Sequence, residues 1–560
     1  MQLQINKKLS QIPLAVLIVL FSAIFSDVYS QTTPWGDDGE IESAEVIIEK
    51  DLQINLPPAS RNFEKVPPPP VQPQKTEQKY QFRNFNYEVR DLDPKIRVLT
   101  IKEEPLGKLY PNFIKGGLGN YITTYAEGYF NNTRNKDYAY GAHIRHNASA
   151  RGPVDGANSG SSENSVALNG KYFTPNVIFS GDMRFDRDKY YFYGYNPVLE
   201  VDRADIRQVF NIFNAVASIE NVNPRTIQYK LSGSFNALQD RFEARETQTG
   251  FNLESSFDVG KKLGFEVRSD LYLMNRRDEI GTMNRNFFRL RPNFLIRTDL
   301  LRIRGGFNFV FENDTVATGD QLHFYPFANL EYDLSENITA YAGIDGDMQR
   351  TSLAGFVNEN PFLAPNVPLL HTNKTFDFFG GIKGKLMQNL NFNVGISSAE
   401  YNNMYFFVNS AQDSSRFDII YDPQNLALLN LFAEIGFNKS EKIRTSIRGD
   451  YYGYSTVLVE EPWHKPNYKL TFLSTYNIYD KIHLNADVNL LGGIKAKNFM
   501  TDEAVDLPTI VDLNLKADYL FSDRFSVFLS FNNILSRNYE RYLYYPSRGL
   551  MVLAGASYSF

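Results

Sequence analysis

The sequence predicts an all-β protein: a transmembrane, antiparallel, up-and-down β-barrel of 22 strands, with 20 strands as the fallback count. Three observations predict this fold. Apolar and polar residues alternate with period two from about residue 110 to the end of the chain. Short turns alternate with long loops over the same region. An export signal and an extended, Pro-rich segment precede it, and we expect this segment to lie in the periplasm.

The composition excludes several other classes of protein. The chain has 560 residues, a net charge of -6 and no cysteine. Without cysteine it forms no disulfide, no thiolate metal site and no cysteine nucleophile, and it carries no lipid on an N-terminal cysteine. The negative charge argues against nucleic acid as a partner. Because 22% of the residues are charged and 43% hydrophobic, we expect a folded chain.

Residues 1–30 are predicted to be a secretory signal peptide. Lys7 and Lys8 precede an apolar run from Ile12 to Phe25, and a small-residue cleavage site follows, where we expect cutting near Ser30. The alternative is a membrane anchor, but the run is shorter than the roughly 20 residues that a spanning helix needs. Cleavage is therefore the interpretation that fits the segment best.

Residues 31–108 are predicted to be an extended periplasmic segment. Proline is frequent, most densely from Pro67 to Pro70, which favours polyproline II conformation and leaves little to pack. Within it, Val46, Ile47 and Ile48 form a short β-prone run with acidic flanks. This run is a candidate partner-binding strand that would add to the sheet edge of another protein. The alternatives are a short ordered patch or a strand that pairs within the chain.

Residues 109–560 are predicted to form the barrel. In Val511–Tyr519 every odd position is apolar and every even position polar, and Ile482–Leu490 alternates in the same way. A third case includes Phe307, Phe309 and Phe311 on one face. A soluble sandwich turns such an apolar face toward its core, whereas an outer-membrane barrel turns it toward lipid. Alternation alone does not choose between the two.

The loop pattern favours the barrel over the sandwich. Successive short turns lie roughly 36 to 53 residues apart, which fits two strands and one longer loop. The predicted short turns are Thr174-Pro175-Asn176, Asn223-Pro224-Arg225, Lys261-Lys262, Thr298-Asp299, Leu334-Ser335-Glu336, Met387-Gln388-Asn389, Asn438-Lys439-Ser440, Tyr479-Asp480-Lys481 and Ser522-Asp523-Arg524. The long loops include Ala150 to Asn164, Thr351 to Asn373 and Val457 to Pro466.

These turns also give a strand count. Nine turns enclose sixteen strands, two more follow the last turn, and two precede the first, from Asp137 to Ser149 and from Ser161 to Phe173. One further hairpin, from about residue 96 to residue 131, raises the total from 20 to 22. The number is expected to be even, because both chain ends lie on the side of the short turns.

The C-terminal forty residues resemble a known family. The segment Phe528–Tyr539 resembles the penultimate strand of TonB-dependent outer-membrane receptors, and Tyr545–Gly549 with Ala554–Phe560 resembles their closing strand. The composition is similar to that of family members from Gram-negative bacteria of the Bacteroidetes type. The resemblance implies that the terminal Phe560 is the signal that the barrel-assembly machinery recognises, and that the barrel lies in outer-membrane lipid.

The chain departs from this family before the barrel. Family members carry a compact plug of strands and helices inside the lumen, but only the Pro-rich residues 31–108 are available here. We therefore predict a barrel without its own plug, and TonB-driven uptake does not carry over. A barrel of this width is too wide for its wall side chains to fill. Three closures are compatible with the sequence: inward-folded loops, the N-terminal segment, or a periplasmic or outer-membrane partner that supplies a plug.

No catalytic, cofactor or metal site is predicted, and we expect no enzyme. His143 and His146 lie three residues apart on a strand and so point to opposite faces, where they cannot share a metal. His323, His371 and His464 lie near loops, where lone histidines are expected to be hydrated. No nucleophile elbow, phosphate-binding loop or H-E-x-x-H motif occurs.

The leading functional hypothesis is a TonB-dependent-receptor-like outer-membrane barrel that acts as a solute channel or transporter, with its lumen closed in one of these three ways. The alternative is a structural subunit of an outer-membrane assembly or secretion complex that transports nothing, with residues 31–108 as its docking arm.

Overall fold

The computed structural model describes residues 109–196, 198–222, 227–314, 321–499 and 501–560, together with Lys79, Gln81 and Arg83. The predicted signal peptide and the candidate partner-binding strand at Val46, Ile47 and Ile48 lie outside the described residues. Both stay predictions.

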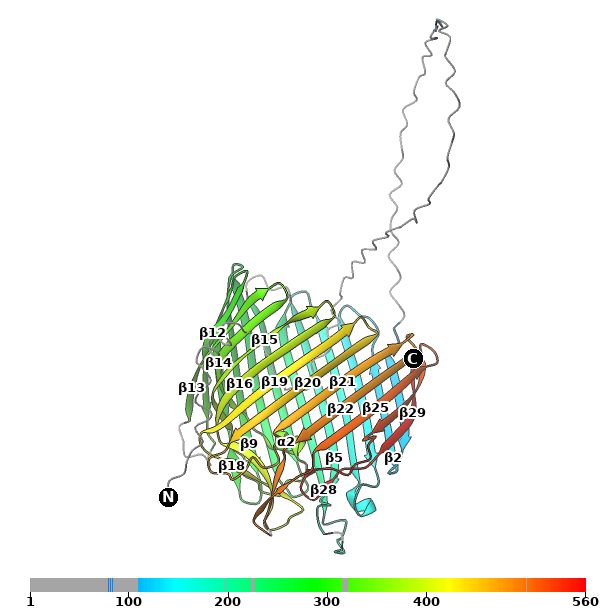
Figure 1. Cartoon of the computed structure of the whole chain (residues 1–560), viewed down its shortest axis with the longest axis vertical. Helices are drawn as coiled ribbons and strands as arrows, with labels where there is room; N and C mark the ends of the chain where they lie inside the picture. Colours follow the sequence, from blue (N-terminus) through cyan, green and yellow to red (C-terminus); the bar gives the residue numbers. More distant parts are fainter. Residues whose placement is uncertain are drawn as a thin grey trace, which may run out of the picture. The chain divides into compact units, whose positions relative to one another are not determined.

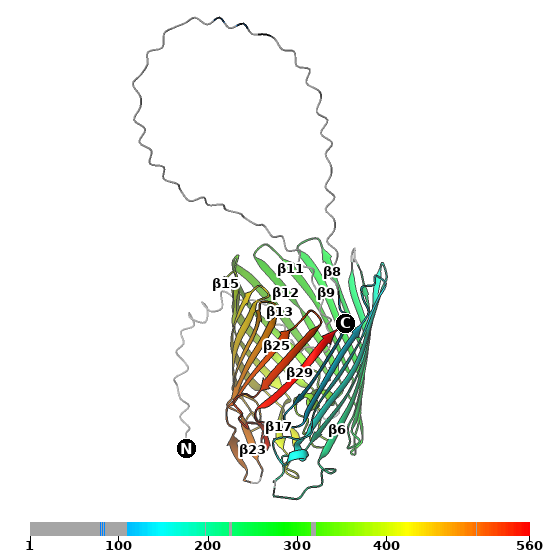
Figure 2. The same ribbon diagram turned by 90° about the vertical axis from the view of Figure 1, so that its right-hand side faces the viewer.

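The described residues form a closed antiparallel β-barrel of 22 strands, as predicted (Figures 1 and 2). The main sheet has 23 strands. The short β10 pairs only with the end of β9 beyond the wall, so 22 strands form the wall itself. Pairing of β1 with β29 closes the ring. The wall strands are β1 (Asn112–Gly119), β2 (Thr123–Asn131), β3 (Tyr138–Ser149), β4 (Ser161–Phe173), β5 (Val177–Tyr191), β6 (Arg207–Asn221), β7 (Gln228–Gln239), β8 (Arg245–Val259), β9 (Leu263–Arg277), β11 (Phe287–Arg297), β12 (Leu301–Glu312), β13 (Leu322–Ser335), β14 (Ile338–Gln349), β15 (Thr372–Met387), β16 (Leu390–Asn402), β19 (Leu426–Lys439), β20 (Ile443–Ser455), β21 (Tyr468–Ile478), β22 (Ile482–Gly492), β25 (Ile510–Leu520), β26 (Phe525–Asn532) and β29 (Met551–Ser559).

The two rims of the barrel differ. Eight of the nine predicted short turns lie among the described residues, and all eight connect wall strands at one end, which we name the turn rim. The ninth, Asn223-Pro224-Arg225, lies outside the described residues. Both ends of the barrel chain meet at the turn rim. Asn112 N donates to Phe560 O (3.1 Å), and Phe560 N donates to Asn112 O (2.9 Å). The other end, the loop rim, carries the long connections. The loop predicted from Ala150 to Asn164 is shorter than expected, because β4 begins at Ser161.

The remaining elements all belong to loop-rim connections. They are η1 (Gly156–Ser159), α2 (Leu353–Glu359), β10 (Thr282–Asn284), and three hairpins: β17 (Met404–Asn409) with β18 (Phe417–Asp422), β23 (Lys495–Asn498) with β24 (Glu503–Asp506), and β27 (Glu540–Tyr542) with β28 (Tyr545–Pro546). No helix among the described residues is long and apolar enough to cross a membrane.

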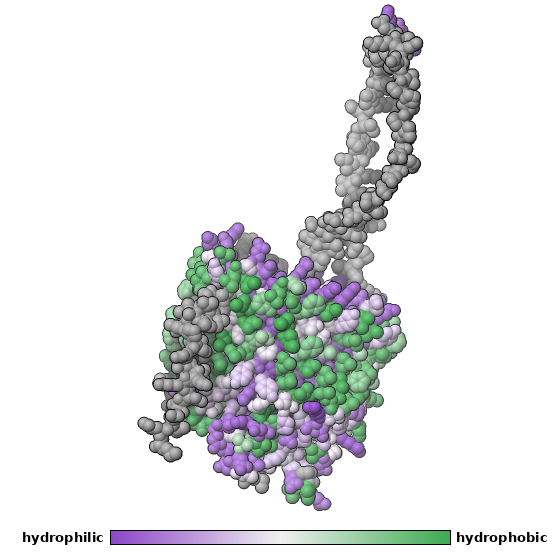
Figure 3. Space-filling model, viewed as in Figure 1, coloured by the Kyte–Doolittle hydropathy of each residue, from purple (hydrophilic) through white to green (hydrophobic). Residues whose placement is uncertain are grey.

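Most of the large apolar side chains of the wall strands face outward. On β12, Phe307, Phe309 and Phe311 are 45%, 37% and 41% exposed, whereas Asn308 and Glu312 between and beyond them are buried on the inner side. On the face that Figure 3 shows, apolar residues predominate over the middle of the wall and hydrophilic residues toward its two ends. A soluble protein does not leave so many large apolar side chains exposed. The outer face is therefore the face that contacts lipid.

Candidate functional site: the lumen and the loop rim

The inner wall is lined by charged side chains that pair across strands. Arg289 on β11 lies 2.6 Å from Asp270 on β9 and 2.8 Å from Asp347 on β14. Arg291 lies 2.9 Å from Asp345. These residues point inward because their outward neighbours on the same strands are apolar. The lumen wall is thus polar and offers hydrogen-bonding groups to a hydrated solute.

The helix α2 carries an apolar face toward the lumen. Ser352 caps the helix by accepting a hydrogen bond from Gly355 N (3.1 Å). Leu353, Phe356 and Val357, spaced i, i+3 and i+4, are 5%, 3% and 4% exposed. A helix of seven residues has little stability by itself, so the packing of this face holds it in place.

The face of α2 belongs to a buried core that we name the loop core. It combines inward-facing residues of β6 and β7 with residues from the β7–β8, β14–β15, β16–β19 and β26–β29 connections. Figures 1 and 2 show α2, β17, β18 and β28 at the loop end of the barrel. Its members are Phe210, Ile212, Leu238, Ala244, Leu353, Phe356, Val357, Leu363, Val367, Leu369, Phe407, Phe417, Ile419, Tyr542 and Tyr545.

Aromatic contacts join the loops within this core. The rings of Phe362 and Tyr545 stack with centroids 3.9 Å apart, and those of Phe417 and Tyr542 lie 5.3 Å apart. Phe356 of α2 contacts Phe407 of β17, with 6.2 Å between centroids. Aromatic pairs of this kind add stability beyond the area that they bury. Three separate loops are therefore fixed to one another and to the wall.

Beside the core, a cluster of buried ionisable groups fixes the β14–β15 connection to the wall. We name it the charge cluster; its members are Glu246, Arg285, Asp314 and His371, and all are at least 90% buried. Arg285 Nε lies 2.6 Å from Asp314 Oδ1, and Arg285 Nη2 lies 3.0 Å from His371 Nδ1. Leu353 N at the start of α2 donates to Glu246 Oε1 (3.0 Å).

The two loop histidines are buried, and the expectation that they are hydrated is wrong. Burial lowers the pKa of His371 to about 3. It also lowers the pKa of His464 to about 4. His464 Nδ1 lies 2.7 Å from Phe407 O, and Leu543 N donates to His464 Nε2 (3.3 Å). Neutral His464 thus connects two loop hairpins. Both of its partners lie far away in the sequence, so they could not be predicted from it.

The other residues singled out from the sequence lie apart from this site. His143 Nε2 contacts Glu127 Oε1 (3.1 Å) on the inner face, whereas His146 Nδ1 contacts Asn164 Oδ1 (2.6 Å) on the outer face. They face opposite sides, as predicted, and no group of residues in the described part of the chain could hold a metal. Phe560 stacks on Tyr558 at the turn rim; its role as an assembly signal stays a prediction.

The loop core had a weak signal in the sequence and the charge cluster had none. A capping serine followed by an i, i+3, i+4 apolar pattern at Ser352–Val357 could have revealed α2, despite the prolines that follow. Arg285 and Asp314, in contrast, are 29 residues apart, and His371 is 86 residues from Arg285. Only the strand register brings them together.

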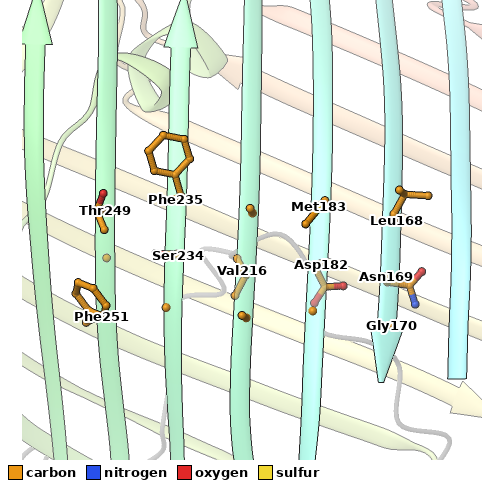
Figure 4. A pocket seen from close by; sticks show the side chains of 15 residues that line it. Leu168, Asn169, Gly170, Asp182, Met183, Val216, Ser234, Phe235, Thr249 and Phe251 are labelled. Atoms are coloured by element: carbon orange, nitrogen blue, oxygen red, sulfur yellow. The ribbon is translucent and has the colours of Figure 1, made fainter. Parts of the chain in front are cut away.

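The outer wall carries a hollow of about 560 Å³ across β4 to β8 (Figure 4). Its floor is a row of small residues, Gly170, Gly181, Ala217 and Gly233, which are register partners on adjacent strands. Larger side chains, including those of Met183 and Phe235, border it. The hollow lies within the apolar outer face and therefore faces hydrocarbon.

Comparison with known proteins supports the fold. No family model matches the sequence, and no curated protein matches it. The structure is similar to that of the siderophore receptor PirA from Acinetobacter baumannii, with a TM-score of 0.64, 11% sequence identity and 80% of each chain covered. It is also similar to the FrpB iron transporter from Neisseria meningitidis, with a TM-score of 0.62, 9% identity, and 81% of this chain and 82% of that chain covered.

A third neighbour is FpvA of Pseudomonas aeruginosa, solved in complex with a heterologous pyoverdine and iron; its TM-score is 0.60 at 11% identity, and the match covers 80% of this chain and 71% of that chain. These neighbours are TonB-dependent receptors and transporters of siderophores or iron. At such low identity the likeness concerns the fold. The described residues therefore have the barrel fold of TonB-dependent outer-membrane receptors, as the C-terminal resemblance implied.

Proposed function

We propose that this chain is an outer-membrane barrel that moves a solute through its lumen, and that the loop core is the lid of that lumen at the loop rim. In this proposal the loop rim faces the cell exterior, and the turn rim and the N-terminal segment face the periplasm. The observation that carries it is the loop core itself, which joins Phe210 and Ile212 of the inner wall with residues of four different loops.

Two further observations support the proposal. The inner wall carries paired charges such as Arg289 with Asp270, which suits passage of a polar solute and does not suit a sealed structural core. The structural neighbours are transport receptors, and one of them is solved with an iron chelate. Closure from the turn rim is assigned to residues 31–108 or to a partner protein that supplies a plug. TonB coupling is no part of the proposal.

The test is ion conductance of the purified full chain in planar lipid bilayers. In a first variant, residues 352–370 are replaced by a short Gly-Ser linker, which removes α2 and much of the loop core. We expect small conductance for the native chain and at least a severalfold increase for this variant. A second variant that also lacks residues 31–108 should conduct more if that segment closes the turn rim.

The matched control shortens a loop outside the loop core, residues 153–158 with most of η1, and should leave conductance unchanged. Folding of every variant is checked by the heat-dependent shift of the barrel in gel electrophoresis. Equal conductance with and without the 352–370 replacement, in chains that both lack residues 31–108, would contradict the lid. A barrel that stays silent in all variants and co-purifies with one fixed partner would instead support the structural-subunit alternative.

A further inference from the structure

We propose that the outer face of β4–β9 binds a phosphate-bearing lipid, whose headgroup is held by a cationic cluster at the loop rim and whose acyl chain fills the hollow below it. This inference rests on the proposed placement of the barrel in the outer membrane. It assigns a ligand to the outside of the wall, whereas the proposed function concerns the lumen.

The cationic cluster consists of outward-facing basic residues near the loop rim. Its members are Arg187, Lys189, Arg203, Arg207, Arg245 and Arg277. All except Arg203 lie on β5, β6, β8 or β9, at the alternating positions that also carry exposed apolar residues such as Phe185 and Phe213. These are the outward-facing positions of the strands. Their inward neighbours are paired instead: Arg184 with Asp186, and Arg276 with Asp278, both in salt bridges of 2.8 to 2.9 Å.

None of the six cations forms a salt bridge with another described residue. The charged neighbours of the Lys189 ammonium are Arg203, Arg207 and Arg187, all positive. Arg203 is held over the ring of Tyr191, with 4.7 Å between Cζ and the ring centroid. Gathering like charges is unfavourable unless an anion neutralises them. Guanidinium groups match phosphate geometry especially well.

The strand register places three of these cations in one row across neighbouring strands. Arg187 pairs with Asn211, which pairs with Gln239 of β7, and Gln239 pairs with Arg245, which pairs with Arg277. The row is polar or charged at every position on five adjacent strands. One row toward the turn rim, the outward residues include Phe185 and Phe213. On these strands the apolar part of the outer face therefore ends at this row on the side of the loop rim.

The hollow lies directly below this boundary on the same strands. On β5, Met183 is four residues and Gly181 six residues from Arg187, so the hollow begins about 13 Å and extends to about 20 Å below the cations at 3.3 Å per residue. That depth is where an acyl chain would lie beneath a headgroup bound at the cationic row. Cations above and an apolar recess below, on the same strands, are complementary to the two halves of one lipid.

The arrangement is local to this side of the barrel. On β19 to β22, the outward residues near the loop rim include Ala427, Gly453, Tyr468 and Gly492, none of them charged. A general property of the rim would have placed cations there as well.

The test measures lipid binding to the full-length, detergent-purified chain by native mass spectrometry. The probes are phosphatidic acid, diacylglycerol with the same acyl chains, and inorganic phosphate. We expect phosphatidic acid to bind at least tenfold more tightly than diacylglycerol, and inorganic phosphate to bind more weakly than phosphatidic acid. In the triple variant Arg187→Gln, Lys189→Gln, Arg207→Gln, affinity for phosphatidic acid should fall to that for diacylglycerol.

A second variant tests the hollow. Gly181 and Gly233 have open space where a Cβ would be, so Gly181→Leu with Gly233→Leu fills the hollow without a backbone clash. It should weaken phosphatidic acid binding severalfold and leave inorganic phosphate binding unchanged. The controls are Gly449→Leu, outward on β20, and Arg524→Gln at the turn rim; both should bind as the native chain does.

Equal binding of phosphatidic acid and diacylglycerol by the native chain, or unchanged binding by the triple variant, would overturn the proposal. Inorganic phosphate binding as tightly as phosphatidic acid would overturn the assignment of the hollow. Conductance does not enter this measurement, so failure here leaves the lid untouched. A chain that purifies in water without detergent would instead refute the membrane barrel on which both proposals rest.

Discussion

The two rims of this barrel are built from the same wall strands and end differently. At the loop rim, connections of up to about 20 residues fold into a shared core with buried charges and buried histidines. At the turn rim the connections are short and leave residues such as Tyr479 (92%) and Phe521 (61%) exposed. The residues that the wall does not need are therefore concentrated in the connections of the loop rim, where they form a core of their own.

The largest expected effect comes from breaking the charge cluster. In Arg285→Ala, Asp314 and Glu246 lose their buried cation, which should destabilise the loop core by roughly 3–5 kcal/mol. Hydrogen exchange in detergent should show the backbone of residues 352–370 losing protection, while the wall strands keep theirs. The double variant Arg285→Met with Asp314→Leu removes the closest ion pair and should recover part of the loss, because Glu246 keeps its hydrogen bonds from Leu353 N and Gln248 Nε2. Equal loss in wall and loops would contradict a separate loop core.

Lowering the pH should destabilise the loop core and leave the stability of the turn rim unchanged. His371, with a pKa lowered to about 3, stays neutral in the packed core, whereas in the opened loop it regains its ordinary value near 6.5. The opened form therefore binds more protons between these values, and the core loses up to about 1.4 kcal/mol per pH unit as the pH falls below 6.5. His464, with a pKa lowered to about 4, acts in the same direction.

Protease sensitivity of residues 352–370, measured from pH 7.5 to pH 4.5, checks this dependence. His371→Asn keeps an oxygen where Nδ1 accepts from Arg285 but does not titrate. It should therefore lower the pH dependence and leave only the part due to His464. Sensitivity independent of pH in the native chain would show that neither histidine is coupled to opening.

A smaller effect is expected at the cap of α2. Ser352→Ala removes the acceptor for Gly355 N and should cost about 1 kcal/mol of loop-core stability. Hydrogen exchange at residues 353–357 reports it. Ser352→Asn, which keeps a capping oxygen, should restore the native protection, and failure to do so would assign the loss to some other contact of Ser352.

The smallest effect is expected at the turn rim. Tyr479 has φ 53°, where a non-Gly residue pays roughly 1–2 kcal/mol that glycine avoids, although glycine gives up a similar amount in unfolded-chain entropy. Tyr479→Gly should change barrel stability by less than about 1 kcal/mol, measured as the midpoint of heat-dependent unfolding in gel electrophoresis. Any change in protection of residues 352–370 would mean that the two rims are coupled.

The wall could be predicted from the sequence because its signals are local. The alternation of Val511–Tyr519 and the placement of turns such as Tyr479-Asp480-Lys481 gave faces, rims and strand count without knowledge of any long-range contact. Lipid forces one apolar face on every strand, so the pattern repeats along the chain.

The site could not be predicted in the same way. Phe210 belongs to the loop core although its strand looks like every other wall strand, because its partners come from loops far away in the sequence. His371 and His464 are ordinary loop histidines until several segments cover them. The cationic row needs the register of five strands before Arg187 and Arg277 are seen in one row. Each of these features depends on long-range contacts that alternation does not encode.

The central claim, that the loop core covers a lumen open to solute beneath it, is tested most directly by thiol accessibility. The chain has no cysteine, so Ser218→Cys places a single thiol on the inner face of β6, about 20 Å below Ile212 at 3.3 Å per residue. A bulky, membrane-impermeant maleimide is added to whole cells from outside. The account predicts slow labelling in the native background and fast labelling once residues 352–370 are replaced by a linker. Equally fast labelling in both backgrounds would contradict it.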